Sequence, residues 1–144
     1  DSIRERPKTM AVCVHLCRGN MGHGMANGGY EAIAERLFQR LDVDGYLLEF
    51  DTPRAGDFQP LRFVPKGKRV AVGIMTTKSA EVESADTLKA RIDEAAQSID
   101  LAQLCLCPQC GFSSNAGTGT LPLDAVERKL ARVVEVAHEV WGQG

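Results

Sequence analysis

The sequence has no long hydrophobic run and almost no excess of charge of either sign. No apolar stretch approaches the roughly 20 residues that a membrane-spanning helix needs, and the opening DSIRERPKTM lacks the apolar core of a secretory leader. Seventeen basic and 19 acidic residues leave a net charge of −2, which argues against a general nucleic-acid binder. With 44% hydrophobic residues among 144, residues 1–144 are predicted to be a single cytoplasmic segment without a membrane or nucleic-acid partner.

Cysteine is the unusual component of this composition. Cys13 and Cys17 lie near the start, and Cys105, Cys107 and Cys110 form a second group. The count is odd, and the sequence is not that of a small secreted scaffold. In a reducing cytosol, clustered cysteines bind metal or do chemistry more often than they form disulfides.

Short apolar, β-rich runs alternate with helical patterns. The runs cover residues 10–16, 45–50, 69–75 and 103–107. They lack a clean alternation, which predicts strands buried on both faces, as in a parallel sheet. Apolar residues at helical spacing cover residues 30–41, about 84–99 and 122–141. The segment 51–68 carries three prolines and little helical pattern.

This order of elements predicts an α/β fold of four βα units with right-handed crossovers. Four units are half of a (β/α)8 barrel of TIM type. An open four-stranded sheet is the alternative, but its edges and inner face would need cover. We therefore expect either a missing barrel half or a second copy of the chain as a partner.

Metal-binding residue types stand where the predicted strands end. His15 and Cys17 end the first strand, Glu49 ends the second, and Cys110 follows the fourth. The carboxyl ends of parallel strands meet at one edge, where α/β proteins place their sites. Sulfur, nitrogen and oxygen donors suit tetrahedral zinc.

Each donor also has a purely structural interpretation. His15 and Cys17 point to the same side of a strand, so they suit one ion, but also a core histidine beside a buried cysteine. Glu49 in a buried strand is costly unless it binds metal or pairs with Arg18 or Arg54. Asp51, two residues further on, is the rival carboxylate at this edge.

The second cysteine group is equally open to two interpretations. Cys107 and Cys110 resemble a zinc knuckle, although no second pair of this kind exists to complete it. Cys13, Cys105 and Cys107 also fit as small buried apolar residues.

Two further features accompany this edge. Lys78 follows the third strand and either binds an anionic group there or is a solvated loop charge. The glycine-rich stretch 19–29 fits a mobile loop over the edge and does not match a phosphate-binding fingerprint.

Four motifs, taken in order, resemble the catalytic domain of cobalamin-independent methionine synthase and its shorter single-barrel relatives. They are HLCRGN at 15–20, LEFDT at 48–52, GIMTTKS at 73–79 and PQCGFS at 108–113. The likeness spans nearly the whole chain and corresponds to the carboxyl-terminal half of that family's barrel. It implies a methyltransferase that moves a methyl group from a methylated folate of the 5-methyltetrahydrofolate class to the thiol of homocysteine, giving methionine.

The resemblance also implies roles for individual residues. The zinc ligands are His15, Cys17, Glu49 and Cys110, and Cys107 is not among them. Four residues at the same edge are expected to bind substrate: Arg18, Asp51, Arg54 and Ser113.

The expected chemistry gives Glu49 and Lys78 catalytic roles. A free thiol titrates near 8.5, whereas zinc deprotonates a bound thiol. A closed four-ligand site leaves no room for the substrate, so we expect Glu49 to loosen when the thiol arrives. Lys78 stands where the family carries a histidine thought to protonate the folate leaving group.

This departure at Lys78 keeps two other functions open. One is a zinc enzyme that acts on a different thiol or electrophile, and the other is a non-catalytic zinc-binding fragment. The other barrel half supplies most of the family's substrate contacts, so the chain alone is expected to hold zinc without being active.

Overall fold

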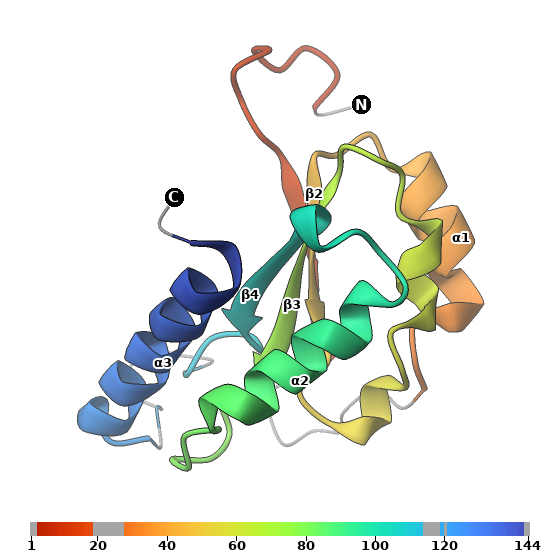
Figure 1. The fold of residues 1–144 in the computed structure, drawn as a ribbon. Helices are drawn as coiled ribbons and strands as arrows, with labels where there is room; N and C mark the ends of the chain where they lie inside the picture. Colours follow the sequence, from red (N-terminus) through yellow and green to blue (C-terminus); the bar gives the residue numbers. More distant parts are fainter. Residues whose placement is uncertain (1–2, 19–27, 114–118, 120, 143–144) are drawn as a thin grey trace.

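The computed structural model describes residues 3–18, 28–113, 119 and 121–142, and these form alternating strands and helices (Figure 1). The strands are β1 (Cys13–Leu16), β2 (Gly45–Glu49), β3 (Arg69–Met75) and β4 (Leu104–Pro108). The helices are α1 (Glu31–Arg40), α2 (Ala85–Ala96) and α3 (Leu123–Trp141). The predicted order of elements is confirmed.

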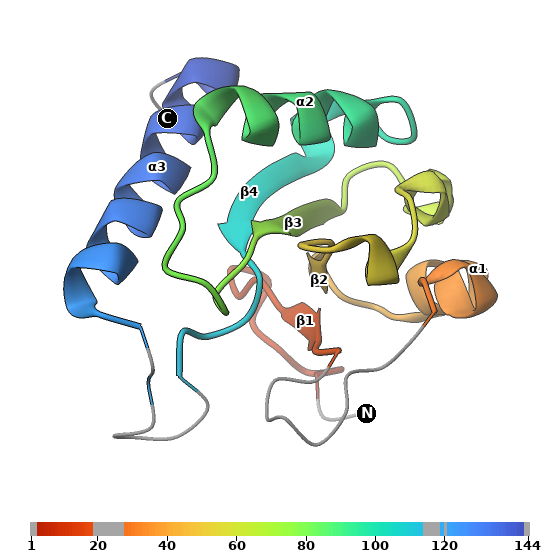
Figure 2. The ribbon, with the colours of Figure 1, turned by 90° about the horizontal axis from the view of Figure 1, so that it is seen from below.

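All strand pairs are parallel, and the strands lie in chain order, β1-β2-β3-β4. Viewed towards the carboxyl ends of the strands, the sheet follows an arc with the helices along its outer side (Figure 2). Sequential parallel neighbours with helices on the outside are the arrangement of half a (β/α)8 barrel, as predicted.

The connection between β2 and β3 has no α-helix. It contains two short 3₁₀ helices, η1 (Pro53–Ala55) and η2 (Gln59–Phe63), and η2 packs against α1. A proline begins or nearly begins each of them, which suits the first turn of a helix but not its interior. The sequence prediction of an irregular segment over 51–68 is therefore confirmed.

The core lies between the sheet and its helices, and aromatic side chains fill it under the carboxyl edge. The ring of Phe50 lies 5.1 Å from that of Tyr30 and 4.6 Å from that of Phe58, measured between centroids. Burial of such rings contributes about 1.5–3 kcal/mol each. They support the end of β2, where Glu49 lies.

Burial on both faces is confirmed for β2 and β3 but is wrong for β1. Cys13 and His15 are exposed, and in β4 only Leu104 is fully buried. In the described part of the chain, β1 and β4 each pair with a single strand, so the neighbours that would cover them are not supplied by these residues. The interpretation of Cys13 as a small buried residue is wrong for this reason.

Among the described residues, none of the helices combines the length and the hydropathy needed to cross a membrane.

Candidate metal centre

Three potential metal ligands from two strands converge at the carboxyl edge of the sheet. His15 lies near the end of β1, Cys17 directly follows that strand, and Glu49 ends the neighbouring β2. One ligand atom from each lies within 4.8 Å of the other two. Zinc bonds of about 2.0–2.3 Å separate tetrahedral donors by about 3.3–3.8 Å, so small side-chain rotations bring all three onto one ion.

Glu49 is the buried member of this group, and its two oxygens have different surroundings. Oε2 accepts the backbone N–H of Arg18 at 2.9 Å and a longer bond from Gln109 Nε2 at 3.4 Å. Oε1 lies 3.5 Å from Nε2 of His15 and has no hydrogen-bond partner within the described residues. A buried carboxylate oxygen without a donor is costly, and a cation shared with His15 and Cys17 would satisfy it. The residues present therefore fit a divalent ion.

Tyr30 fixes the backbone of Glu49. Its hydroxyl accepts the Glu49 N–H at 2.9 Å and donates to the Glu49 carbonyl at 3.3 Å. Burial raises the pKa of Tyr30 to about 12, so the phenol is neutral and keeps its proton for this bond. The sequence prediction counted Tyr30 only as part of an apolar helix stripe.

Cys110 lies in the turn after β4, beside the same carboxylate. Burial, followed by the negative charge of Glu49, raises the pKa of the Cys110 thiol to about 11, while Lys78 acts in the opposite direction. Hydrogen bonding to Glu49 and the proximity of Cys17 raise the pKa further. Without a cation, the thiol therefore stays protonated at neutral pH. Cys110 is not among the three residues whose ligand atoms lie within 4.8 Å of one another, so its place as the fourth ligand stays a prediction.

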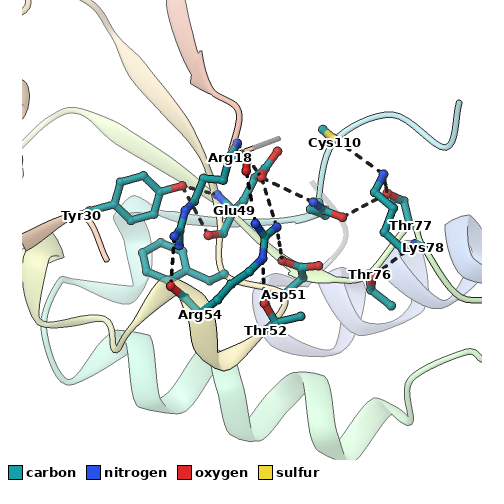
Figure 3. Close-up of polar contacts among 12 residues, drawn as sticks. Arg18, Tyr30, Glu49, Asp51, Thr52, Arg54, Thr76, Thr77, Lys78 and Cys110 are labelled. Carbon is teal, nitrogen blue, oxygen red and sulfur yellow. Dashed lines mark hydrogen bonds and ion pairs between the residues drawn. The ribbon is translucent and has the colours of Figure 1, made fainter. Parts of the chain in front are cut away.

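Lys78, an exposed residue three positions after β3, has its ammonium group near Cys110. Its Nζ is 2.8 Å from Thr77 Oγ1, 3.3 Å from the Gly111 carbonyl and 3.9 Å from Cys110 Sγ. Thr77 in turn donates to Gln109 Oε1 at 3.3 Å. Because Gln109 also contacts Glu49, a chain of polar contacts joins the lysine to the carboxylate (Figure 3).

The buried residues Thr77 and Gln109 were not predicted as site residues. Both lie inside the motifs that the sequence analysis quoted, directly beside Lys78 and Cys110. Their position within those motifs was the only available signal.

Arg54 lies between two buried carboxylates. Its Nη2 is 3.9 Å from Glu49 Oε2 and 3.7 Å from Asp51 Oδ1. Burial raises the pKa of Asp51, and the charge of Arg54 only partly offsets the rise. Asp51 Oδ1 accepts no hydrogen bond from the described residues. Asp51 also lines a cavity of about 480 Å³, together with residues of the segment that follows it and of α2.

The other two predicted substrate-binding residues are placed differently. The buried Arg18 donates through Nη2 to the carbonyl of Arg54 at 3.0 Å and to that of Gly28, and its own carbonyl accepts from Arg54 Nη1 at 3.2 Å. Ser113 is exposed, three residues beyond Cys110. The structure therefore brings Arg18, Asp51 and Arg54 together around Glu49, and the role of Ser113 stays a prediction. Most of the glycine-rich stretch, residues 19–27, lies outside the described residues.

Gly73, in β3, allows the turn that carries Cys110 to approach closely. A Cβ at this position would lie 3.0 Å from the Leu48 carbonyl oxygen, from Gln109 Cα and from the Pro108 carbonyl oxygen. The register between β3 and β4 also shifts here, between Gly73 and Met75. Gln109, the residue directly after β4, contacts Glu49 beyond this irregularity.

The fold and the site together define the class of protein: an α/β barrel segment with imidazole, thiol and carboxylate donors at the carboxyl edge of its strands. The family model for the catalytic domain of cobalamin-independent synthases matches residues 7–139. The chain belongs to this family, as the four motifs predicted.

Two curated proteins match nearly the whole length of the chain. The chain is 43% identical over 143 residues to the Bacillus subtilis (strain 168) protein YxjG, and 41% identical over the same length to YxjH of that organism; both are described as uncharacterized. In each case the alignment covers 98% of this chain but only 38% of the relative. The chain thus spans about two fifths of the length of these relatives.

Two solved structures share the fold. One is a Listeria monocytogenes protein, provisionally assigned as a vitamin-B12-independent methionine synthase, with 32% identity, a TM-score of 0.71 and coverage of 99% of this chain and 38% of that one. The other is a B12-independent methionine synthase from Shewanella sp. W3-18-1 in complex with selenomethionine, with 21% identity, a TM-score of 0.72 and coverage of 96% and 40%. The partial coverage agrees with a half barrel.

Proposed function

We propose that the complete protein is a zinc-dependent methyltransferase that moves a methyl group from a methylated folate to the thiol of homocysteine. The observation that carries the proposal is the convergence of His15, Cys17 and Glu49, with a buried carboxylate oxygen that no described residue satisfies. Family membership supports the same reaction class. Because the chain covers 38% of its relatives, we propose that the remaining barrel segment supplies the other substrate contacts.

The ion would be held by His15, Cys17, Glu49 and Cys110, and it would supply the positive charge that lets an incoming thiol lose its proton near neutral pH. The pKa of Cys110 is raised in the metal-free site, so protons and metal compete for this sulfur. In our proposal Glu49 is the donor that gives way to a substrate, because its Oε2 keeps the hydrogen bonds from the Arg18 backbone N–H and from Gln109 and the charge of Arg54 nearby.

The other site residues of the chain are proposed to bind the substrates and to protonate the departing group. Lys78 holds its ammonium group against Cys110, anchored by Thr77 and Gly111, and in our proposal it donates a proton to the departing group. Asp51 lines the cavity described above, and Arg54 lies 3.7 Å from its Oδ1. Both are proposed, with Arg18 and Ser113, to bind the polar parts of the substrates.

A second candidate keeps the metal and the thiol but changes the methyl donor. Lys78 favours it, because an ammonium group is a weaker acid than the imidazolium that the family carries at this position. A non-catalytic zinc-binding segment is the remaining alternative.

Elemental analysis of the purified protein tests the metal site directly. We expect one equivalent of zinc in the wild type and a large loss in His15→Ala and Cys110→Ser. Cys107→Ser is the matched control, because Cys107 lies in the strand that leads to the same turn and is not a proposed ligand. Zinc retained in all variants would contradict the site. Methyl transfer from a methylated folate to homocysteine by the full-length polypeptide then separates the first candidate from the second.

A further inference from the structure

A second buried polar network lies between the loop after β3 and helix α3, outside the metal centre. The side chain of Lys129, on α3, is completely buried, and its Nζ donates to Oε2 of Glu83 at 2.8 Å. The other oxygen of Glu83 accepts the backbone N–H of Thr76, also at 2.8 Å. Thr76 is the first residue after β3. One carboxylate thus connects the last helix to the end of the strand that leads to Lys78.

Thr76 is the point where this network meets the candidate site. Its Oγ1 accepts the backbone N–H of Lys78 at 3.2 Å, and its hydrogen bonding favours the ionised form of Asp51. Figure 3 shows Thr76 beside Lys78 and Asp51. The backbone that leads to Lys78 is therefore held on one side by Glu83 and on the other by the residues around Glu49.

A gain in stability is not the expected role of a buried ion pair of this kind. Removing an ammonium group from water is expensive, and replacing a buried ion pair with apolar residues of similar volume is often neutral or stabilising. Among the described residues, Lys129 has Glu83 as its charged partner. What the pair does achieve is a fixed position for the carboxylate, and through it for Thr76.

We infer that Glu83 and Lys129 are positioning residues for Lys78. Lys129 holds Glu83, and Glu83 fixes the backbone amide of Thr76. Lys78 lies two residues further on, so the position of Thr76 sets where the Lys78 ammonium group meets Thr77 Oγ1, the Gly111 carbonyl and Cys110. Part of this inference rests on the proposed function, because that function gives Lys78 its role in the reaction. The tether itself is independent of the reaction.

Two double variants of the full-length polypeptide isolate the tether from the charges of the ion pair. The first, Glu83→Gln/Lys129→Met, removes both charges but keeps a side-chain carbonyl at position 83 that still accepts from Thr76. Its amide group reaches water, because the side chain at position 83 is 21% exposed. The second, Glu83→Leu/Lys129→Met, removes the charges and the acceptor together. The two variants therefore differ in the hydrogen bond to Thr76, and urea unfolding measures whether either of them is globally destabilised.

The first measurement is amide hydrogen exchange at Thr76, which needs no activity. In the Glu83→Gln double variant we expect protection close to that of the wild type, and in the Glu83→Leu double variant a loss of about tenfold or more. Exchange at amides of the central strand β2 is the internal control, because global destabilisation would weaken protection there as well.

The second measurement is methyl transfer. We expect kcat to fall about tenfold to 100-fold in the Glu83→Leu double variant, because small misplacements of a reacting group have effects of this size. KM and zinc content should stay the same. The Glu83→Gln double variant should keep a rate close to that of the wild type.

Equal Thr76 exchange in the two double variants would overturn the tether. Equal kcat in the two would overturn its role in placing Lys78. A wild-type protein that transfers no methyl group, but whose Thr76 exchange differs between the variants as expected, supports the tether and contradicts the proposed function. The two failures are therefore distinguishable.

Discussion

Oε1 of Glu49 lies 3.5 Å from Nε2 of His15, and the two side chains are 1% and 38% exposed, respectively. This buried carboxylate oxygen gains a partner either from an N–H of the imidazole or from a cation that both groups bind. The first arrangement needs no metal. The second makes the Glu49 charge a requirement for metal binding.

Glu49→Gln distinguishes these two arrangements. If a cation is shared, we expect the affinity for zinc to fall about 100-fold or more, since even residues that only support a ligand contribute about 10–100-fold. Titration calorimetry with zinc measures the change. Glu31→Gln is the control, because Glu31 pairs with Arg62 on the exposed surface and should leave the affinity unaltered. An unchanged affinity in Glu49→Gln would support the simple proton-bridged pair.

Lys78→Met tests the role of the ammonium group against Cys110. We expect zinc content to be retained and methyl transfer to fall about 100-fold or more, the usual contribution of a positioned proton donor. Lys78→Arg should recover little, because a guanidinium group gives up its proton even less readily than an ammonium group. Comparable turnover in wild type and Lys78→Met would remove this residue from the mechanism.

Much of the fold was predictable because its signals are local. β2 and β3 were predicted to within a residue from continuous apolar runs, and α1 from the stripe that ends in Leu41. The exposure of β1 was not predictable in this way. Whether a strand is covered depends on neighbours that its own residues do not specify, and His15 lies on the open side of β1.

The candidate site divides in the same way. His15, Cys17 and Glu49 were predictable because unusual residue types end apolar strands. Tyr30 and Lys129 were not. A tyrosine in an apolar stripe is indistinguishable from a core residue, and a lysine in a helix is normally exposed. Lys129 is buried against a partner, Glu83, that lies 46 residues earlier in the chain.

Gly73→Ala tests whether close backbone approach sets the position of the Cys110 turn. The new Cβ would meet backbone atoms of Leu48, Pro108 and Gln109 at 3.0 Å, and backbone yields less easily than a side chain. We expect a loss of about 1–3 kcal/mol in the free energy of unfolding and weaker zinc binding, because the turn must move outward. Gly111→Ala is the control, since its Cβ would meet only the Ser113 carbonyl oxygen at 3.4 Å. Equal zinc affinity in Gly73→Ala and wild type would contradict the argument.

Arg54→Met tests whether Arg54 compensates the charges of Glu49 and Asp51 at the carboxyl edge of the sheet. Without the guanidinium group, Glu49 and Asp51 are two buried carboxylates with no counterion between them. We expect a loss of about 3–5 kcal/mol in the free energy of unfolding of the metal-free protein at pH 7. The loss should shrink as the pH falls, because burial already raises the pKa of Asp51 and protonation removes the unpaired charge.

Urea unfolding at about pH 7 and about pH 5 measures both effects of Arg54→Met. The exposed Arg62→Met serves as the control, because its partner Glu31 lies on the surface. A similarly small loss of unfolding free energy in Arg54→Met and Arg62→Met would show that Arg54 is not needed to balance the two buried carboxylates.

The last prediction concerns alkaline pH. Burial raises the pKa of Cys107 to about 12 from 9.0 and that of Tyr30 to about 12 from 10.0. Both groups are neutral when protonated, so the folded protein keeps its protons at pH values where the unfolded chain has released them. Unfolding then releases protons, and stability must fall as the pH rises from about 9 towards about 12. We expect the free energy of unfolding of metal-free Cys107→Ser to fall less steeply between about pH 9 and about pH 11. Serine does not titrate in this range, so unfolding of the variant releases one proton fewer. Urea unfolding at several pH values measures the slope. Identical slopes in wild type and Cys107→Ser would show that this thiol is accessible to water and that the strand leading to the Cys110 turn is open to solvent.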